Sequence, residues 1–315
     1  MNISTPTSPT LEATLRPLRP EDLSAVVELD RLSSGTSRRG YFEKRLQAAL
    51  RKPREHLQYA LTAPQGLIGF LLARRAGGEY GRPDEVVVLE TIGVDLALRR
   101  HGLGQRMLAG LEQWMGAHAI SNLVTQVDWR NHSMLKFLAG AGFRLAPRSI
   151  LERSVERISH GFVDDEDLET MPPVVRSLKA SDFDAVVRID QRITGKDRSK
   201  YLTRKFDEVL NESAIEVSLI GEADGFPVAF AMARVDFGDF GHVEPSASLD
   251  TIGVDPRFAR QGYGRSVLSQ MIQNLAALHV ERLETEVASE SFALLRFLFD
   301  LGFGPSARLS FVRAV

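Results

Sequence analysis

Two glycine-rich turns are the parts of this 315-residue chain best suited to chemistry. They read Arg99-Arg100-His101-Gly102-Leu103-Gly104 and Ala259-Arg260-Gln261-Gly262-Tyr263-Gly264, and each lies between a strand-like run and an amphipathic helical pattern. Glycines at such a junction let backbone N–H groups point toward one place, and the N-terminus of the following helix adds positive potential. The turns therefore suit a diphosphate.

The alternative interpretation is a helix-start turn in which the glycines serve only to allow a positive φ. Two copies in the same frame, each followed by a basic residue (Arg106 or Arg265), favour anion binding instead. A dinucleotide-binding turn would need a third glycine where Met107 and Val267 stand. A Walker loop would need a Gly-Lys-Ser/Thr ending, which neither turn has.

The turns belong to a duplication that covers most of the chain. Thr91-Ile92-Gly93-Val94-Asp95 returns unchanged as Thr251-Ile252-Gly253-Val254-Asp255, and the same offset pairs residues from Asp30 with Asp190 through Gly142 with Gly302. A repeat of this length exceeds the units of solenoid proteins, which are about 20 to 45 residues long, and has the size of a domain. We therefore expect a tail (1–13), a first domain (14–155), an acidic and proline-containing linker (156–173) and a second domain (174–315).

Hydrophobic patterning predicts the same order of elements in each copy. A short strand and helices are followed by a β-hairpin, a strand with an internal glycine, the turn, a helix, a strand, a helix and a last strand. The last strands are expected at about Ser149–Val155 and Leu309–Val315. The internal glycines, Gly93 and Gly253, predict a bulge or a close approach of another backbone.

The composition describes an ordinary globular protein with few special requirements. The chain is 43% hydrophobic and 25% charged, and its net charge of -2 with a pI near 6.4 disfavours nucleic acid as the main ligand. No apolar run approaches the roughly 20 residues of a membrane span, and the N-terminus lacks a signal-peptide pattern, so we expect a cytoplasmic protein without a membrane partner. The absence of cysteine and of ligand-like histidine spacing predicts no metal site.

Each half resembles the GNAT superfamily of acyl-CoA N-acyltransferases. The resemblance rests on the Arg/Gln-x-x-Gly-x-Gly/Ala turn after a strand ending in Val-Asp, the following helix and a late Gly-Phe. It implies an α/β (α+β) fold of two GNAT-like domains, each with a mixed, mostly antiparallel sheet, a bulged strand and flanking helices. It also implies acetyl-CoA as the acyl donor. The diphosphate would lie on the turn that begins at Arg99 or Arg260, and the pantetheine would run beside Ile92 and Val94, or Ile252 and Val254.

The resemblance also implies direct attack of an amine on the thioester, helped by a carboxylate that removes a proton. Glu90 and Asp250 match one place where the family has this carboxylate, so they are the candidate bases; the alternative is a carboxylate that faces solvent or pairs with an arginine. The family often has a tyrosine that protonates the thiolate, but Leu138 and Leu298 stand at its positions. The thiolate then leaves unaided, another group serves, or the chemistry has been lost.

The family selects its acceptor with the segment after the first helix. Here both copies hold Gly-x-x-Arg-x-x-Tyr, with Arg38 and Tyr41 in the first and Arg198 and Tyr201 in the second. An arginine could hold a carboxylate or phosphate of the acceptor while the tyrosine lines the pocket. The alternative is that the arginine bonds within the fold and the tyrosine belongs to the core.

Tyr80-Gly81 and Phe240-Gly241 precede the bulged strands and are expected to border the cleft of the site. His132 becomes Phe292 in the second copy, so a role for this histidine would not be shared.

The leading hypothesis is an N-acetyltransferase that moves the acetyl group of acetyl-CoA to a primary amine of a small molecule or a protein. A second version has one working half and one that only stabilises it. A hypothesis of another class is an acyl-CoA-binding sensor that retains the turn without catalysis. The tandem copies are expected to form an internal pseudo-dimer in a monomer, or a homo-oligomer.

Overall fold

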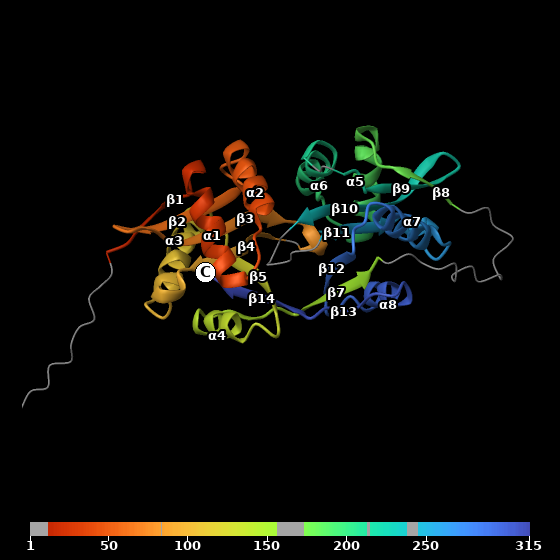
Figure 1. Ribbon diagram of the computed structural model, residues 1–315. Coiled ribbons are helices and arrows are strands. Elements are labelled where there is room, and N and C mark those ends of the chain that lie inside the picture. The colour runs from red at the N-terminus through yellow and green to blue at the C-terminus, as the bar shows by residue number, and fades with distance from the viewer. Residues whose placement is uncertain (1–11, 83, 156–172, 213–214, 238–244) are drawn as a thin grey trace, which may run out of the picture. The chain divides into compact units, whose positions relative to one another are not determined.

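The computed structural model describes residues 12–82, 84–155, 173–212, 215–237 and 245–315 (Figure 1). Its helices are α1 (Leu23–Ser34), α2 (Arg39–Arg51), α3 (Leu103–Ala117), α4 (His132–Gly140), α5 (Phe183–Thr194), α6 (Ser199–Asp207), α7 (Tyr263–Ala277) and α8 (Phe292–Asp300). Contacts divide the chain into two compact units. One contains the described residues up to Arg75, Val86–Val124 and Ala314–Val315, and the other contains Ala76–Glu85 and the described part of Thr125–Arg313.

Two seven-stranded sheets form the framework. The first has the order β1 (Thr14–Pro17), β2 (His56–Ala63), β3 (Gly66–Gly77), β4 (Glu85–Val94), β5 (Asn122–Asp128), β14 (Arg308–Ala314) and β6 (Arg144–Leu145). The second has the order β13 (Gly304–Pro305), β7 (Arg148–Ser154), β12 (Arg282–Ala288), β11 (Pro245–Val254), β10 (Phe226–Phe237), β9 (Leu219–Ala223) and β8 (Val174–Ser177). The β4–β5 and β11–β12 pairs are parallel. The mixed, mostly antiparallel sheets flanked by helices confirm the expected fold class.

The last strand of each repeat lies in the sheet that contains the other repeat. β7 comes from the first repeat, and its residues from Arg148 to Ser154 pair antiparallel with β12. β14 comes from the second repeat and lies between β5 and β6. The repeat boundaries 14–155 and 174–315 therefore remain our proposal for the copied unit, while strand pairing crosses them.

Alternation along β10 explains how the second sheet is covered on both faces. Ala229, Ala231 and Ala233 lie in the core cluster with α7, whereas Phe230 and Met232 lie in the cluster with α5 and α6 (Figure 1). Successive side chains of a strand point to opposite faces, so these two sets are separated by the sheet. Phe70 and Leu72 of β3 join the cluster formed with α1 and α2 in the same way.

Candidate functional site

The two glycine turns share one backbone conformation. Gly102 and Gly262 are the N-cap residues of α3 and α7, with φ of 73° and 83°. Two residues earlier, Arg100 and Arg260 also have positive φ, at 70° and 62°. Non-glycine residues seldom adopt this conformation, which costs about 1–3 kcal/mol and tends to persist at functional sites.

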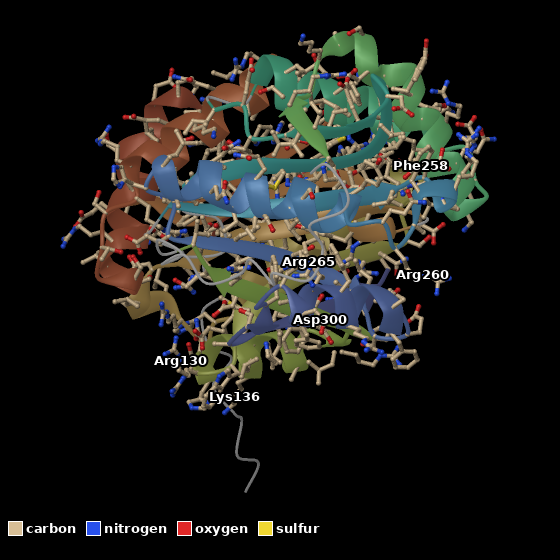
Figure 2. All side chains as sticks on the ribbon, turned by 90° about the vertical axis from the view of Figure 1, so that its right-hand side faces the viewer. Arg130, Lys136, Phe258, Arg260, Arg265 and Asp300 are labelled. Carbon is tan, nitrogen blue, oxygen red and sulfur yellow. The ribbon has the colours of Figure 1, made fainter. Side chains whose placement is uncertain are left out.

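The hydrogen-bond donors that these turns offer are backbone N–H groups, because no side chain caps the helix start at Gly102 or Gly262. A glycine N-cap has no side chain to occupy the first amides of a helix, and these amides have no partner within the helix. Arg100 is exposed, and Arg260 and Arg265 lie on the face of the second repeat seen in Figure 2. Backbone N–H groups with guanidinium groups nearby are an arrangement that suits an anion.

The remaining side chains of the turns bond or pack locally. His101 Nδ1 lies 3.2 Å from the carbonyl oxygen of Leu98 and 3.0 Å from that of Arg99. Leu103 is buried, and the ring of Tyr263 packs edge-on against Phe258 with centroids 5.8 Å apart. These three side chains therefore bond or pack beside the turn.

Close packing accounts for the glycines around the turn. A Cβ on Gly264 would lie 3.2 Å from Val254 Cγ2, so glycine brings the start of α7 close to the end of β11. A Cβ on Gly93 would lie 2.5 Å from the Phe70 ring, and one on Gly253 would lie 2.7 Å from the Phe230 ring. The close neighbours of Gly93 and Gly253 are thus side chains rather than another backbone, and the bulge found in β11 falls at Asp250.

β11 and β12 separate in the middle of the second sheet. Their register runs from Ser246 opposite Arg282 to Ser248 opposite Glu284, and then the Thr285 hydroxyl donates to the Leu249 carbonyl at 2.8 Å. On its other side, β11 has a bulge, because Met232 pairs with Thr251 and Ala233 with Leu249, which leaves Asp250 as the extra residue. Ile252–Val254 therefore has an edge toward β12 that carries no strand pairing in the described residues, and such an edge can accept another extended chain.

The two candidate bases lie in buried ion-pair networks. The Glu90 carboxylate is 3.1 Å from Arg45 and 3.0 Å from Arg74. Asp250 is bonded to Lys205 at 2.7 Å and lies 3.5 Å from Arg234. Pairing with an arginine was the alternative considered for these carboxylates; Glu90 shows it, whereas the hydrogen bond of Asp250 comes from Lys205, with Arg234 further away.

Asp250 nevertheless keeps one available oxygen. Lys205 donates to its Oδ2, whereas its Oδ1 is buried without a hydrogen-bond partner in the described structure. Buried polar atoms without a partner are rare and costly, and they often mark a place where a ligand binds. Asp250 is thus both anchored and able to accept one further hydrogen bond.

The residues predicted to bind the acceptor are engaged within the fold. Arg38 makes two bonds to Asp30, at 2.9 Å and 2.5 Å, and the Tyr41 hydroxyl lies 3.2 Å from Thr91 Oγ1. Arg198 bonds to Asp190 at 2.9 Å, and burial raises the pKa of Asp190 against the opposing effect of Arg198. Tyr41 and Tyr201 are members of core clusters.

A cluster around Glu286 was not predicted from the sequence. Glu286 Oε1 is 2.6 Å from Arg148 and also contacts Arg82, and Glu286 Oε2 accepts from Gln126 at 3.0 Å. A second group of buried charged side chains therefore lies around β12, which carries Glu286. The ion-pair networks around Glu90 and Asp250 could have been predicted from the repeat, because positions 45 and 205, and 74 and 234, are basic in both copies.

These features define a class of protein, and comparison with known proteins identifies the family. The family model described as "Acetyltransferase (GNAT) family" matches residues 23–143 and 183–303. The chain belongs to the GNAT acetyltransferase family and carries its domain twice. Enzymes of this family transfer acyl groups from acyl-CoA to amine acceptors, so this protein is an acyltransferase.

Individual relatives agree with this assignment. The [ribosomal protein bS18]-alanine N-acetyltransferase of Escherichia coli strain K12 is 29% identical over 131 residues, which is 41% of this chain and 79% of the relative. A GCN5-related N-acetyltransferase from Sphaerobacter thermophilus has a TM-score of 0.62 at 15% identity, with 97% of each chain covered. A tandem GNAT protein from the clavulanic acid biosynthesis pathway has a TM-score of 0.63 at 14% identity, covering 96% of this chain and 98% of its own. At these identities the two structures establish a shared fold.

None of the helices in the described residues is both long and apolar enough to cross a membrane. No group of three or more His, Cys, Asp or Glu side chains in the same part of the chain could hold a metal ion.

Proposed function

We propose that this protein transfers the acetyl group of acetyl-CoA to a primary amine of a small molecule or a protein. The proposal rests on one observation: the unpaired edge of β11 leads directly into the turn at Arg260–Gly264. An extended donor with a diphosphate at one end fits an extended edge that leads to an anion site.

The order of these two features sets the direction of the donor. The diphosphate would bind the amides of the turn, which follows the end of β11. The pantetheine would then run back along Val254 and Ile252, and its thioester would lie near the bulge at Asp250. The turn at Arg99–Gly104 has the same backbone conformation, so we propose a second coenzyme site beside Ile92 and Val94.

Asp250 is the base that we propose for the second repeat. Its Oδ2 is fixed by Lys205, and its partnerless Oδ1 can accept a proton from the attacking amine. Glu90 has the equivalent position in the first repeat, where both arginines hold it, and we propose the same role there with lower turnover.

Arg38, Tyr41, Arg198 and Tyr201 are proposed to position the site. The guanidinium groups of Arg38 and Arg198 are held by Asp30 and Asp190, and the two tyrosines belong to the core. Binding the acceptor directly would require these arginines to leave their carboxylates, which is costly for buried ion pairs.

The proposal is tested by following release of the coenzyme A thiol with a panel of primary amines. The panel includes a peptide with N-terminal alanine, because a relative modifies such a terminus in ribosomal protein bS18. We expect at least one amine to be acetylated and Asp250→Asn to lower kcat by about 10²-fold or more, which is the usual contribution of a general base. Asp224→Asn, in the exposed β9–β10 turn, is the matched control.

The acyl-CoA-binding sensor gives a different result in the same experiment. Such a protein binds acetyl-CoA but releases no thiol above the rate of hydrolysis with any amine. That outcome would contradict the proposed transferase activity while leaving the coenzyme site intact.

A further inference from the structure

A segment that precedes β4 in the first repeat is held by arginines of the second compact unit. Residues Ala76–Glu85 belong to that unit, although by sequence they lie between β3 and β4. Three arginines donate to backbone carbonyl groups of the segment: Arg204 to Gly77 at 2.5 Å, Arg198 to Gly78, and Arg148 to Tyr80 at 2.6 Å. Hydrogen bonds from charged donors are stronger than neutral ones, so these contacts fix the position of the segment.

The Glu79 side chain and the backbone at Tyr80 give the segment its shape. The Glu79 carboxylate is buried, its Oε2 accepts from the Gly77 amide at 2.6 Å, and its Oε1 lies 3.2 Å from Arg204. Tyr80 has a φ of 56°, which a non-glycine residue adopts only where its surroundings enforce it. Phe240-Gly241, the equivalent of Tyr80-Gly81 by the repeat offset, lies outside the described residues. The segment is therefore a well-defined part of the second compact unit.

The segment lies beside the proposed transfer centre of the second repeat. Its turn Glu79–Gly81, the short orange turn next to β11 in Figure 1, contacts both β11 and β12. Gly78 lies so close to Tyr201 that a Cβ on this glycine would overlap the tyrosine ring. Tyr201 and Lys205 are one turn apart on α6 and so share a face, and Lys205 is bonded to Asp250. The segment is therefore on the α6 side of β11, the side from which an amine reaches Asp250.

We propose that Gly77–Tyr80, supplied by the first repeat, forms a wall of the acceptor pocket in the second repeat and restricts that pocket to unbranched primary amines. This assignment rests on the proposed function and specifies its substrate class. Because Gly78 already touches the Tyr201 ring, the wall cannot move further toward α6 to admit a wider acceptor. An amine on a CH₂ group is narrow beside its nitrogen, whereas an amine on a branched carbon, such as the α-amino group of alanine, carries a further substituent there. The second repeat therefore prefers the unbranched amine.

Comparison of the two repeats indicates that the wall can be released without unfolding α6. Arg38 makes two bonds to Asp30, whereas its counterpart Arg198 makes one bond to Asp190 and another to the carbonyl of Gly78. Asp190 Oδ2 and Arg198 Nε are buried and have no hydrogen-bond partner in the described structure. Gly78 and Asp190 thus compete for one guanidinium group. Once released from Gly78, Arg198 can pair with Asp190 through two bonds, as Arg38 does with Asp30.

The experiment compares two amines on the full-length protein with acetyl-CoA. One is an unbranched primary amine, and the other is the same amine with a methyl group on the carbon that carries nitrogen. We expect the wild type to prefer the unbranched amine by about 10-fold or more in kcat/KM, as is usual for one such group.

Two variants open the wall in different ways. Gly78→Ala pushes the segment away from Tyr201, and Arg204→Met removes the bonds to Gly77 and Glu79. In both, the preference should fall to about twofold or less while KM for acetyl-CoA stays unchanged. The matched controls should keep the wild-type preference: Gly225→Ala, a glycine of positive φ (79°) with open space in the β9–β10 turn, and Arg188→Met, exposed on α5.

Hydrogen exchange and a double variant give readings that a loss of activity alone does not. The amides of Gly77–Tyr80 should exchange faster in Gly78→Ala and Arg204→Met than in the wild type. Adding Asp250→Asn to Gly78→Ala should abolish the gained activity toward the branched amine, because the gain belongs to the second repeat.

The outcomes separate the wall from the transferase. A wild type that accepts both amines equally or prefers the branched one, a preference that is unchanged when the segment exchanges faster, or a gain that survives Asp250→Asn would overturn the wall while the transferase stands. Unchanged exchange in both variants would overturn the contacts on which the wall depends. Absence of thiol release from the wild type with every amine would overturn the proposed function itself, and the wall with it.

Discussion

Gln126 and Glu286 occupy the same position in the two repeats, and their side chains bond to each other, with Gln126 Nε2 donating to Glu286 Oε2 at 3.0 Å. The duplicated position now holds an amide in one copy and a carboxylate in the other. The carboxylate in turn forms ion pairs with Arg82 and Arg148. Divergence of the two copies at this position lets them form a hydrogen bond where two identical carboxylates would repel.

Gln126→Glu should therefore destabilise the protein in a pH-dependent way. Two carboxylates about 3 Å apart cannot both be ionised without a cost, and protonation of one relieves it. We expect the unfolding temperature to fall by about 5 °C at pH 7, for a cost of about 2 kcal/mol, and the difference to narrow at pH 5. Gln47→Glu, exposed on α2, is the control. An equal loss at both pH values would show that packing rather than charge is responsible.

Lys205 is expected to contribute strongly to stability. It is fully buried between Asp250 and Glu208. Lys205→Met would remove the positive charge that balances these two carboxylates. We expect a loss of about 3 kcal/mol in urea unfolding, at the low end for broken buried pairs, because Arg234 still lies near Asp250. Lys200→Met, which changes an exposed residue of the same helix, should have little effect.

The same lysine predicts a dependence on alkaline pH. Burial alone would lower the pKa of Lys205, but the carboxylates of Asp250 and Glu208 outweigh it and raise the pKa. A raised pKa means that the stabilisation is complete below the unfolded value, near about 10.4, and is lost as the pH rises through the folded value. The difference between wild type and Lys205→Met should shrink only at strongly alkaline pH, and a difference that shrinks near neutrality would contradict this account.

Gly253→Ala tests the close approach inside the bulged strand. Its Cβ would lie 2.7 Å from Phe230 Cε1 and 2.8 Å from Ile193 Cδ1, so we expect a loss of about 1–3 kcal/mol from overpacking. Gly116→Ala is the matched control, and we expect it to increase stability. This exposed glycine of α3 has open space around it, and alanine stabilises a helix relative to glycine by about 0.5–1 kcal/mol. Chemical unfolding of both variants gives the comparison, and a neutral Gly253→Ala would mean that Phe230 moves without cost.

Asp255 predicts an acid dependence. Hydrogen bonds from the Arg257 side chain, followed by those from the Arg257 amide and Arg192, hold the pKa of Asp255 well below its usual range. A depressed pKa gives stability that is present above the unfolded value, near about 3.9, and is lost as the pH falls through the folded value. Asp255→Asn should therefore unfold a few degrees below the wild type at pH 7, with a deficit that narrows below about pH 4. A deficit that does not change with pH would contradict the ion-pair explanation.

Much of the fold could be predicted from the sequence because the two copies support each other. The paired glycine turns and the final strands near 149 and 309 follow from local patterns. The sheet that each final strand joins does not, because alternation along β7 or β14 specifies which face is buried and not which neighbour pairs with it.

The candidate site was harder to predict. The spacing of Arg38 and Tyr41, or of Arg198 and Tyr201, is equally compatible with binding an acceptor and with internal contacts, and the structure has the internal contacts. The position of Tyr80 depends on a hydrogen bond from Arg148, which is far away in sequence, to the Tyr80 carbonyl. Long-range contacts of this kind leave no local pattern.

The central claim is that backbone amides of the two equivalent turns bind the diphosphate of acetyl-CoA, and calorimetric titration of the full-length protein tests it most directly. Gly102→Asp and Gly262→Asp place a negative charge in each turn, whereas Gly102→Asn and Gly262→Asn have nearly the same shape without the charge, and both residue types tolerate the positive φ of these positions. We predict two bound molecules per wild-type chain and per asparagine variant, one for each single aspartate variant and none for the double aspartate variant. Undetectable binding to the wild type, or binding that the double aspartate variant leaves unchanged, would contradict the claim.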